Sequence, residues 1–321
     1  MNIPNRFDRY SPDVLSLIRQ QEAYLSSYKP KARSDESLTW LDRHLRYPLR
    51  LRLVTWLKRS GIYDVLLRTH LLTDWFEEFK SYWVDELGNR PIDIPDFYFL
   101  RGVYRARFQD VALPSENNDN SHLETWQRAE TVYLLFQSQW CHRASDLSQY
   151  LRFIPRGGHV CEYGCGIAPV SVWLVDYAPH FGLVLTFADI PTLNFHFARW
   201  RLRDKPYARA VEIHPDEDSP LDEEYDVIFL LAVLEHLPRP LKIVQHLYDR
   251  LRPGGYLIFD YIKSEGRGLD ASSSLAQREE VFQWIRDHFD VVVGHLKPPF
   301  ESFYSVVCRK PEFSRIESLS A

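Results

Sequence analysis

The stretch "VCEYGCGIAP", residues 160–169, decides how the rest of the chain is interpreted. It holds a Gly-x-Gly turn made by Gly164 and Gly166, with an acid, Glu162, just before it. Alanine and proline stand where a third glycine would be expected. Glycine lets the backbone turn sharply and approach a ligand closely. Because the stretch begins in an apolar run, it predicts a loop that joins a buried strand to a helix.

Strands and helices are predicted to alternate around this turn. This order is typical of an α/β fold in which a doubly wound, mostly parallel sheet is covered by helices. Strands are predicted at 159–164, 182–190, 208–215, 225–233 and 256–262, and helices at 123–139, 144–153, 169–178, 191–204, 239–251 and 274–289.

Two further strands, 290–296 and 302–310, complete a predicted seven-stranded sheet. The loop between them, "KPPFE", is too short for a crossover helix. An antiparallel hairpin is therefore expected at one edge of the otherwise parallel sheet.

The N-terminal part of the chain shows few strand signals and predicts helices. A polar, turn-rich stretch at 113–122 predicts a linker or an exposed loop. We therefore expect a helical domain at 1–120 and an α/β domain at 121–321. Aromatic stretches at 74–88 and 96–108 would either roof a ligand site or form an ordinary apolar core, and the sequence leaves both open.

Composition narrows the class of protein. A net charge of −5 and 45% hydrophobic residues are ordinary for a soluble globular chain. No apolar run approaches the length of a membrane span, and no signal peptide is seen, so a cytoplasmic protein is expected.

The basic segment 43–61 predicts either a solvated helix face or a contact for an acidic partner such as RNA, although overall acidity disfavours nucleic acid. The chain has four cysteines, Cys141, Cys161, Cys165 and Cys308. Their spacing is not that of metal ligands, so no metal site is expected.

The residues around the turn also discriminate between cofactors. A dinucleotide loop needs Gly-x-Gly-x-x-Gly and free N–H groups for the pyrophosphate, and Pro169 removes one such donor. A ligand without phosphate but with an amino-acid tail fits better, because Glu162 would face its ammonium group. Asp189, at the end of the next predicted strand, would hold ribose hydroxyls, which both kinds of ligand have.

At this point the chain resembles a known family. "VCEYGCGIA" resembles motif I of the class I S-adenosylmethionine-dependent methyltransferases, with Ala168 in place of the usual third glycine. The stretch 225–262, "YDVIFLLAVLEHLPRPLKIVQHLYDRLRPGGYLIFDYI", resembles the later region of the same family. The resemblance covers about residues 121–310 and implies a Rossmann-like methyltransferase fold that binds S-adenosylmethionine.

Carried over to this chain, the resemblance implies a set of cofactor-binding residues. Glu162, Gly164 and Gly166 would line the methionine moiety, and Asp189 would bind the ribose. Asp216 would lie beside the adenine, although its acidic surroundings also fit a solvated loop. The full set is Glu162, Tyr163, Gly164, Cys165, Gly166, Asp189, Ile190, Asp216, Leu231 and Ala232.

The expected chemistry is displacement at a methyl group, in which the protein mainly aligns the reactants. His236, after the fourth predicted strand, is the candidate general base, with His196 and His214 as weaker candidates; a structural histidine is the alternative for each. The segment 263–274 after the fifth strand is expected to be an exposed loop able to cover the site.

Several functions remain open from the sequence. The leading expectation is methylation of a small metabolite on oxygen, nitrogen or carbon, by a protein that could form a homodimer. The alternatives are an RNA methyltransferase, a binding protein of the same fold without turnover, and a dehydrogenase.

Overall fold

The computed structural model describes residues 56, 60, 74–88, 91, 134, 138, 147–214, 219–261, 271–296 and 305–312. The chain divides into two compact units, residues 1–103 and 104–321. The predictions for residues 1–55, for 92–133, for most of 263–274 and for Asp216 lie outside the described residues.

The described part of the first unit is one helical segment. Helix α4 (Asp74–Ser81) continues into a π-helical turn, η3 (Tyr82–Glu86), and the segment ends at Gly88, which has a φ of +63°. The helix ends there because a left-handed glycine commonly terminates a helix. One face of the segment is buried: Phe76, Phe79, Tyr82, Trp83 and Leu87.

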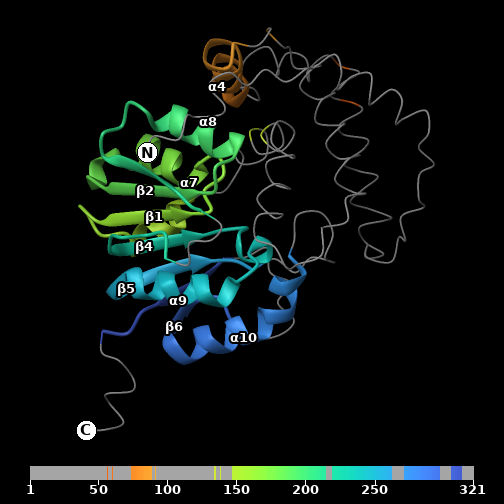
Figure 1. The fold of residues 1–321 in the computed structure, drawn as a ribbon. Coiled ribbons are helices and arrows are strands. Elements are labelled where there is room, and N and C mark those ends of the chain that lie inside the picture. Colours follow the sequence, from red (N-terminus) through yellow and green to blue (C-terminus); the bar gives the residue numbers. More distant parts are fainter. Residues whose placement is uncertain are drawn as a thin grey trace, which may run out of the picture. The chain divides into compact units, whose positions relative to one another are not determined.

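The second unit is built on the predicted seven-stranded sheet (Figure 1). The strand order is β3-β2-β1-β4-β5-β7-β6. The first five strands pair in parallel, whereas β7 runs antiparallel to both of its neighbours, which confirms the closing hairpin. The strands are β1 (His159–Tyr163), β2 (Val184–Asp189), β3 (Ala208–Glu212), β4 (Tyr225–Leu230), β5 (Leu251–Phe259), β6 (Asp290–Val293) and β7 (Val306–Arg309).

Helices cover both faces of this sheet, as the alternation of side chains along each strand requires. In β1, Val160 packs in one core with Val170 and Leu174, whereas Cys161 packs in the other with Val244. The helices of this unit are α7 (Pro169–Tyr177), α8 (Leu193–Leu202), α9 (Pro240–Arg250) and α10 (Ser272–His288), with short 3₁₀ helices η5 (Leu147–Phe153), η6 (Pro179–Phe181) and η7 (Leu234–His236).

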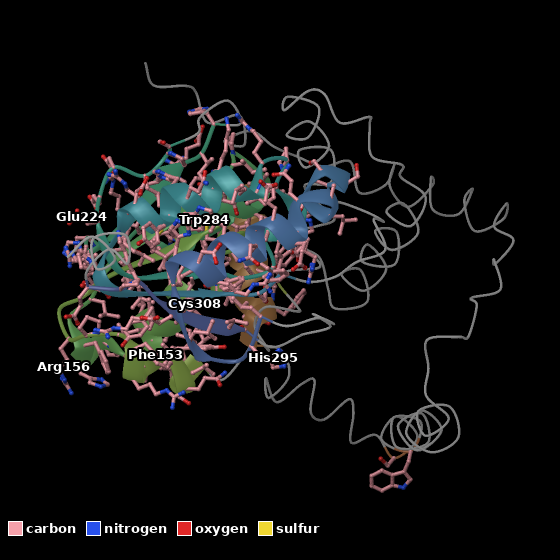
Figure 2. The ribbon with its side chains drawn as sticks, turned by 90° about the horizontal axis from the view of Figure 1, so that it is seen from below. Phe153, Arg156, Glu224, Trp284, His295 and Cys308 are labelled. Atoms are coloured by element: carbon pink, nitrogen blue, oxygen red, sulfur yellow. The ribbon has the colours of Figure 1, made fainter. Side chains whose placement is uncertain are left out.

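An aromatic cluster joins α9 to α10. Trp284, labelled in Figure 2, stacks on His288 with ring centroids 3.9 Å apart and meets Tyr248 edge-on at 5.4 Å. Lys310 lies over the Tyr248 ring and donates to the carbonyl oxygens of Tyr248 and Leu251 at the end of α9, each at 2.8 Å. The two helices are therefore fixed to each other and to the last strand.

Several predicted boundaries were wrong: the third and fourth strands end at Glu212 and Leu230 rather than at 215 and 233, and the helix predicted at 144–153 is the 3₁₀ helix η5. Two further differences have a clear physical reason. Strand β5 begins at Leu251 rather than at Tyr256, because "RPGG" forms an irregularity within the strand: Gly254 donates to the Lys310 carbonyl and Lys310 donates to that of Gly255. Helix α8 begins at Leu193 rather than at 191, because the Thr192 hydroxyl accepts from the N–H of Phe195 and caps the helix.

The loops that follow β1 and β4 approach each other closely at Gly164. Gly164 has a φ of +68°, and a Cβ added there would lie 2.4 Å from the Cγ2 atom of Val233. Only a residue without a side chain allows the turn after β1 to lie this close to the segment after β4. The two loops therefore form one structural unit at the carboxyl edge of the sheet.

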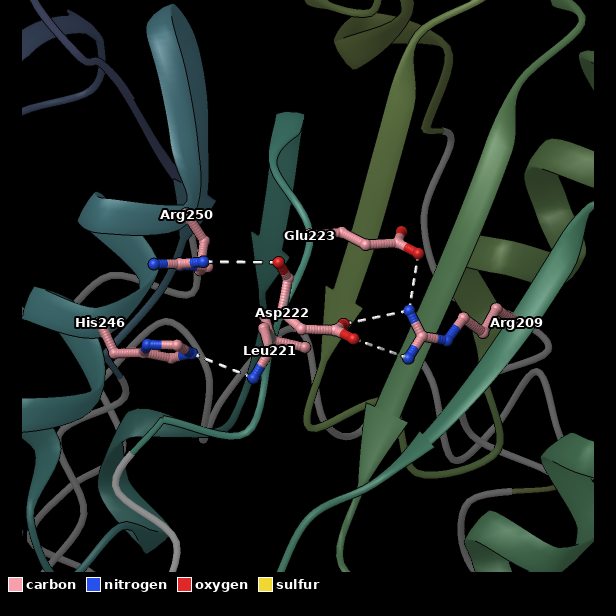
Figure 3. A network of polar contacts seen from close by, with 6 residues as sticks. All are labelled: Arg209, Leu221, Asp222, Glu223, His246 and Arg250. Atoms are coloured by element: carbon pink, nitrogen blue, oxygen red, sulfur yellow. Dashed lines mark hydrogen bonds and ion pairs between the residues drawn. The ribbon is translucent and has the colours of Figure 1, made fainter.

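At the opposite, amino edge, a polar network holds the segment that leads into β4 (Figure 3). The Nε2 atom of His246 accepts from the N–H of Leu221 at 3.2 Å, and Arg250 donates to the carbonyl of Asp222 at 3.5 Å. Arg209 on β3 donates to the carboxylates of Asp222 and Glu223 at 3.0 and 2.6 Å. Residues 221–223 are thereby held between α9 and β3.

We expect Gly164→Ala to destabilise the protein by about 2–4 kcal/mol, because it adds a clash with Val233 to the strain of a left-handed alanine. Gly182→Ala is the matched control, since Gly182 has a φ of +64° but no atom within 4 Å of an added Cβ. Chemical unfolding should show a clearly larger loss for Gly164→Ala than for the control, and Val233→Ala should rescue part of it. Equal losses would contradict the contact.

The His246 bond predicts a pH dependence of stability. Burial lowers the pKa of His246, and its Nε2 can accept from Leu221 only when unprotonated. The folded state therefore prefers neutral histidine, so this contribution is present above the ordinary pKa of about 6.5 and is lost as the pH falls. Relative to His246→Gln, whose oxygen accepts at any pH, the unsubstituted protein should lose on the order of 1 kcal/mol of unfolding free energy between about pH 7 and pH 5. Parallel pH profiles of the two proteins would refute this.

Candidate functional site

The register of the parallel strands gathers the candidate site. Tyr163 pairs with Ala188, and Leu230 pairs with Phe259. The residue that follows each of these four positions therefore lies at the carboxyl edge of the sheet, on one side or the other of the switch point between β1 and β4. These four residues are Gly164, Asp189, Leu231 and Asp260.

The glycine turn is held by its own backbone and by β2. The N–H groups of Gly164 and Cys165 both donate to the carbonyl of Ala188, at 2.8 and 3.0 Å. Ala168, which stands in place of a third glycine, has a φ of +55° and donates to the carbonyl of Cys165 at 2.7 Å. A left-handed alanine costs roughly 1–2 kcal/mol, so the neighbouring contacts must hold this conformation.

Glu162 is buried and caps the helix that follows the turn. Its Oε1 accepts from the N–H of Val170 at 3.0 Å, and its Oε2 accepts from the N–H and the hydroxyl of Ser171 at 2.8 and 2.7 Å. Burial raises the pKa of Glu162 to about 7, although the bonds from Ser171 and Val170 and the charge of Arg201 act in the opposite direction.

This cap bears on which ligand the turn can bind. A pyrophosphate needs N–H donors at a helix N-terminus. In α7, Pro169 has no N–H, and those of Val170 and Ser171 already bind the Glu162 carboxylate. The Glu162 carboxylate therefore takes the place that a bound anion would have at the N-terminus of α7. This argues against a dinucleotide at this turn.

Asp189 lies across the turn from Glu162. Its Oδ2 accepts from the N–H of Gly166 at 2.5 Å and its Oδ1 accepts from the N–H of Ile190 at 2.7 Å. Burial raises its pKa to about 6, while these two bonds and the charge of His236 lower it. Each carboxylate oxygen has more than one acceptor site, so the group can also receive hydrogen bonds from ligand hydroxyls.

Asp260, which directly follows β5, is a site residue that the sequence reasoning missed. Its Oδ1 accepts from the N–H of Ala232 at 2.5 Å, and Ala232 is exposed with a left-handed φ of +53°. Burial raises the pKa of Asp260 to about 6, and the charge of His236 lowers it. The signal was available in "YLIFDYI", where an acid follows a buried strand at its carboxyl end.

His236 lies on η7, and its charge acts on both Asp189 and Asp260. Its Nε2 is 4.0 Å from the Oε1 of Glu235, and its side chain is 20% exposed. The histidine is therefore accessible at the same edge of the sheet, close to the carboxylates of Asp189, Glu235 and Asp260.

A buried polar network fixes η7. The hydroxyl of Ser274 donates to the carbonyl of Leu234 at 2.6 Å, and the N–H of Ala271 donates to the carbonyl of Glu235 at 2.9 Å. Tyr261 bonds to Ser274 in turn. The expectation of a loop over 263–274 is therefore wrong for its last residues, since Ser272–Ser274 form the first turn of α10.

The other candidate residues lie as follows. The side chains of Tyr163 and Cys165 are buried in the core, so these two residues can offer a ligand only backbone groups. Ile190 and Leu231 are partly exposed near the turn. His196 is buried in α8, and His214 lies 4.0 Å from Glu212.

Neither a metal-binding cluster nor a membrane-spanning helix is present among the described residues. They contain no group of three or more His, Cys, Asp or Glu side chains that could hold a metal ion. Among the same residues, no helix combines the length and the apolar character that crossing a membrane requires.

Comparison with known proteins gives relatives for the second unit. A family model described as a methyltransferase domain matches residues 133–300, over half of the chain. The ubiquinone biosynthesis O-methyltransferase of Shewanella pealeana is 27% identical over 107 residues, which are 33% of this chain and 44% of that protein. The sterol 4-C-methyltransferase of Caenorhabditis elegans is 26% identical over 132 residues, 40% and 37% of the two chains. The match spans less than half the length of these curated relatives.

A solved structure is also similar. It is an O-methyltransferase family protein from Burkholderia thailandensis, with a TM-score of 0.45 and 13% identity over 68% of this chain and 71% of that chain. The family model, the strand order and the glycine turn lead to one conclusion: the chain belongs to the class I S-adenosylmethionine-dependent methyltransferase family.

Proposed function

We propose that this protein is a methyltransferase that binds S-adenosylmethionine at the carboxyl edge of β1 and β2 and methylates a small molecule. The observation that carries the proposal is the turn itself: Glu162 occupies the helix N-terminus that a phosphate would need, and Asp189 lies beside the turn as an acceptor for hydroxyls. These groups fit a ligand with a ribose, an ammonium group and no phosphate. Membership of the family supports the same reading.

The proposed roles follow from the chemistry of each group. Asp189 accepts the ribose hydroxyls, and the backbone of Gly164 and Gly166 lies along the methionine moiety. Glu162, whose two oxygens already bind α7, acts on the ammonium by its charge, directly or through water. Ile190, Leu231, Ala232 and Asp216 complete the proposed cofactor contacts, together with the backbone of Tyr163 and Cys165.

When bound, S-adenosylmethionine supplies an electrophilic methyl group on a positively charged sulfur. His236 is the proposed general base: its imidazole accepts the proton of an acceptor hydroxyl, and Asp189 and Asp260 stabilise the resulting imidazolium. The remaining contribution of the protein is alignment of the two reactants and exclusion of water.

The acceptor and its surroundings are also part of the proposal. Residues 1–120 are proposed to cover the acceptor or to form a homodimer surface, and the protein is proposed to act in the cytoplasm, where its three described cysteines would stay as free thiols. Relatives named for ubiquinone and sterol methylation favour a small acceptor over RNA.

Binding is the first test. The purified chain should bind S-adenosylhomocysteine in calorimetry and should not bind NAD, and Asp189→Asn should weaken binding about 10–100-fold, because a charged acceptor of hydroxyl hydrogen bonds is lost. Asp176→Asn, on the exposed face of α7, is the matched control and should bind as the unsubstituted chain does. No binding of S-adenosylhomocysteine, or tighter binding of NAD, would overturn the proposal. If the chain binds S-adenosylhomocysteine but methylates neither a small acceptor nor RNA, it would be a binding protein of this fold that has no catalytic turnover.

The raised carboxyl pKa values predict how binding depends on pH. In the free protein the pKa of Asp189 is about 6 and that of Glu162 about 7, and the ligand prefers both groups ionised. Binding therefore releases protons, so affinity for S-adenosylhomocysteine should rise from about pH 5 and level off near about pH 8. Asp189→Asn should flatten the lower part of the profile. An affinity that does not change with pH would show that the ionisation of neither carboxylate affects binding.

A further inference from the structure

The glycine turn has a support on α8 that no sequence pattern indicated. The Nη1 atom of Arg201 donates to the carbonyl oxygen of Ile167 at 2.8 Å. The guanidinium lies over the ring of Phe197, four residues earlier on the same helix, at 5.3 Å from its centroid. Stacking on Phe197 restricts the side chain, so the arginine is aimed at the turn before any ligand arrives.

The carbonyl that Arg201 binds is well placed to control the turn. The Ile167 carbonyl belongs to the peptide group that precedes Ala168, the residue held at a φ of +55°. A hydrogen bond from a charged donor is stronger than one between neutral groups, so it can help to hold the left-handed alanine in place. Arg201 therefore offsets the strain that the missing third glycine creates.

The same guanidinium acts on Glu162. The charge of Glu162 acts on the thiols of Cys161 and Cys165, and the charge of Arg201 acts on Glu162 and lowers its pKa. Burial raises the pKa of both thiols well above the ordinary value, so they stay neutral. Among these groups, Arg201 is the one cation.

We propose that Arg201 is a positioning residue of the cofactor site, which fixes the glycine turn through the Ile167 carbonyl and supplies the positive charge that opposes Glu162. The inference rests on the proposed function, because the turn is taken to hold S-adenosylmethionine. It assigns to α8 a role in binding that is exerted through the turn rather than by contact with the ligand.

The test compares Arg201→Gln and Arg201→Lys with Arg203→Gln, using calorimetric titration with S-adenosylhomocysteine across the pH range. Arg203 is the matched control, because it also lies at the end of α8 and stacks on an aromatic ring, Trp200, but does not touch the turn. Arg201→Gln should weaken binding about tenfold and move the midpoint of the pH profile upward by about one unit. Arg201→Lys should restore the midpoint but only part of the affinity, since a single ammonium replaces the planar fork.

The outcomes separate the inference from the function it rests on. If the unsubstituted protein fails to bind, the proposed function is wrong. If it binds and Arg201→Gln shows unchanged affinity and midpoint, the role of Arg201 is refuted. A merely structural role would lower the melting temperature without moving the midpoint. If Arg201→Gln does not fold, Arg201→Lys decides, because full affinity at every pH in that variant would equally refute the role.

Discussion

The buried carboxylate of Glu162 is the interaction on which this site depends. It joins the end of β1 to the beginning of α7 by three hydrogen bonds, to the N–H groups of Val170 and Ser171 and to the Ser171 hydroxyl. A helix that starts within a few residues of a strand end leaves N–H groups unsatisfied, and here the strand supplies their acceptor. The turn between them is thereby short and tightly fixed.

The capping of α7 by Glu162 decides what kind of ligand the carboxyl edge of the sheet can hold. Helix N-termini at such edges commonly attract phosphate. In this chain the position is filled from within, and the carboxylates of Asp189 and Asp260 line the same edge. Hydroxyl and cationic groups are therefore favoured over anionic ones, in keeping with a ligand that has a ribose and a sulfonium but no phosphate.

The turn also shows how a departure from a family pattern is accommodated. Ala168 replaces a glycine in a left-handed conformation, and it is buried in the same core cluster as Phe187 and Phe195. Packing and the Arg201 bond to the preceding carbonyl hold a conformation that alanine alone would avoid. Gly164, by contrast, has no such freedom, because Val233 fills the space that a side chain would need.

The sequence by itself determined the order of strands and helices, the closing hairpin, and the positions of Gly164, Gly166 and Asp189, because periodicity, short loops and glycine turns are local properties. It did not reveal Asp260, the second role of Glu162 as a helix cap, or Arg201. Each of these depends on residues far apart in the chain: Asp260 meets Ala232 only through the pairing of β4 with β5, and Arg201 meets Ile167 only after α8 packs beside the turn. Strand register and helix packing set these contacts, and both are decided by the tertiary structure.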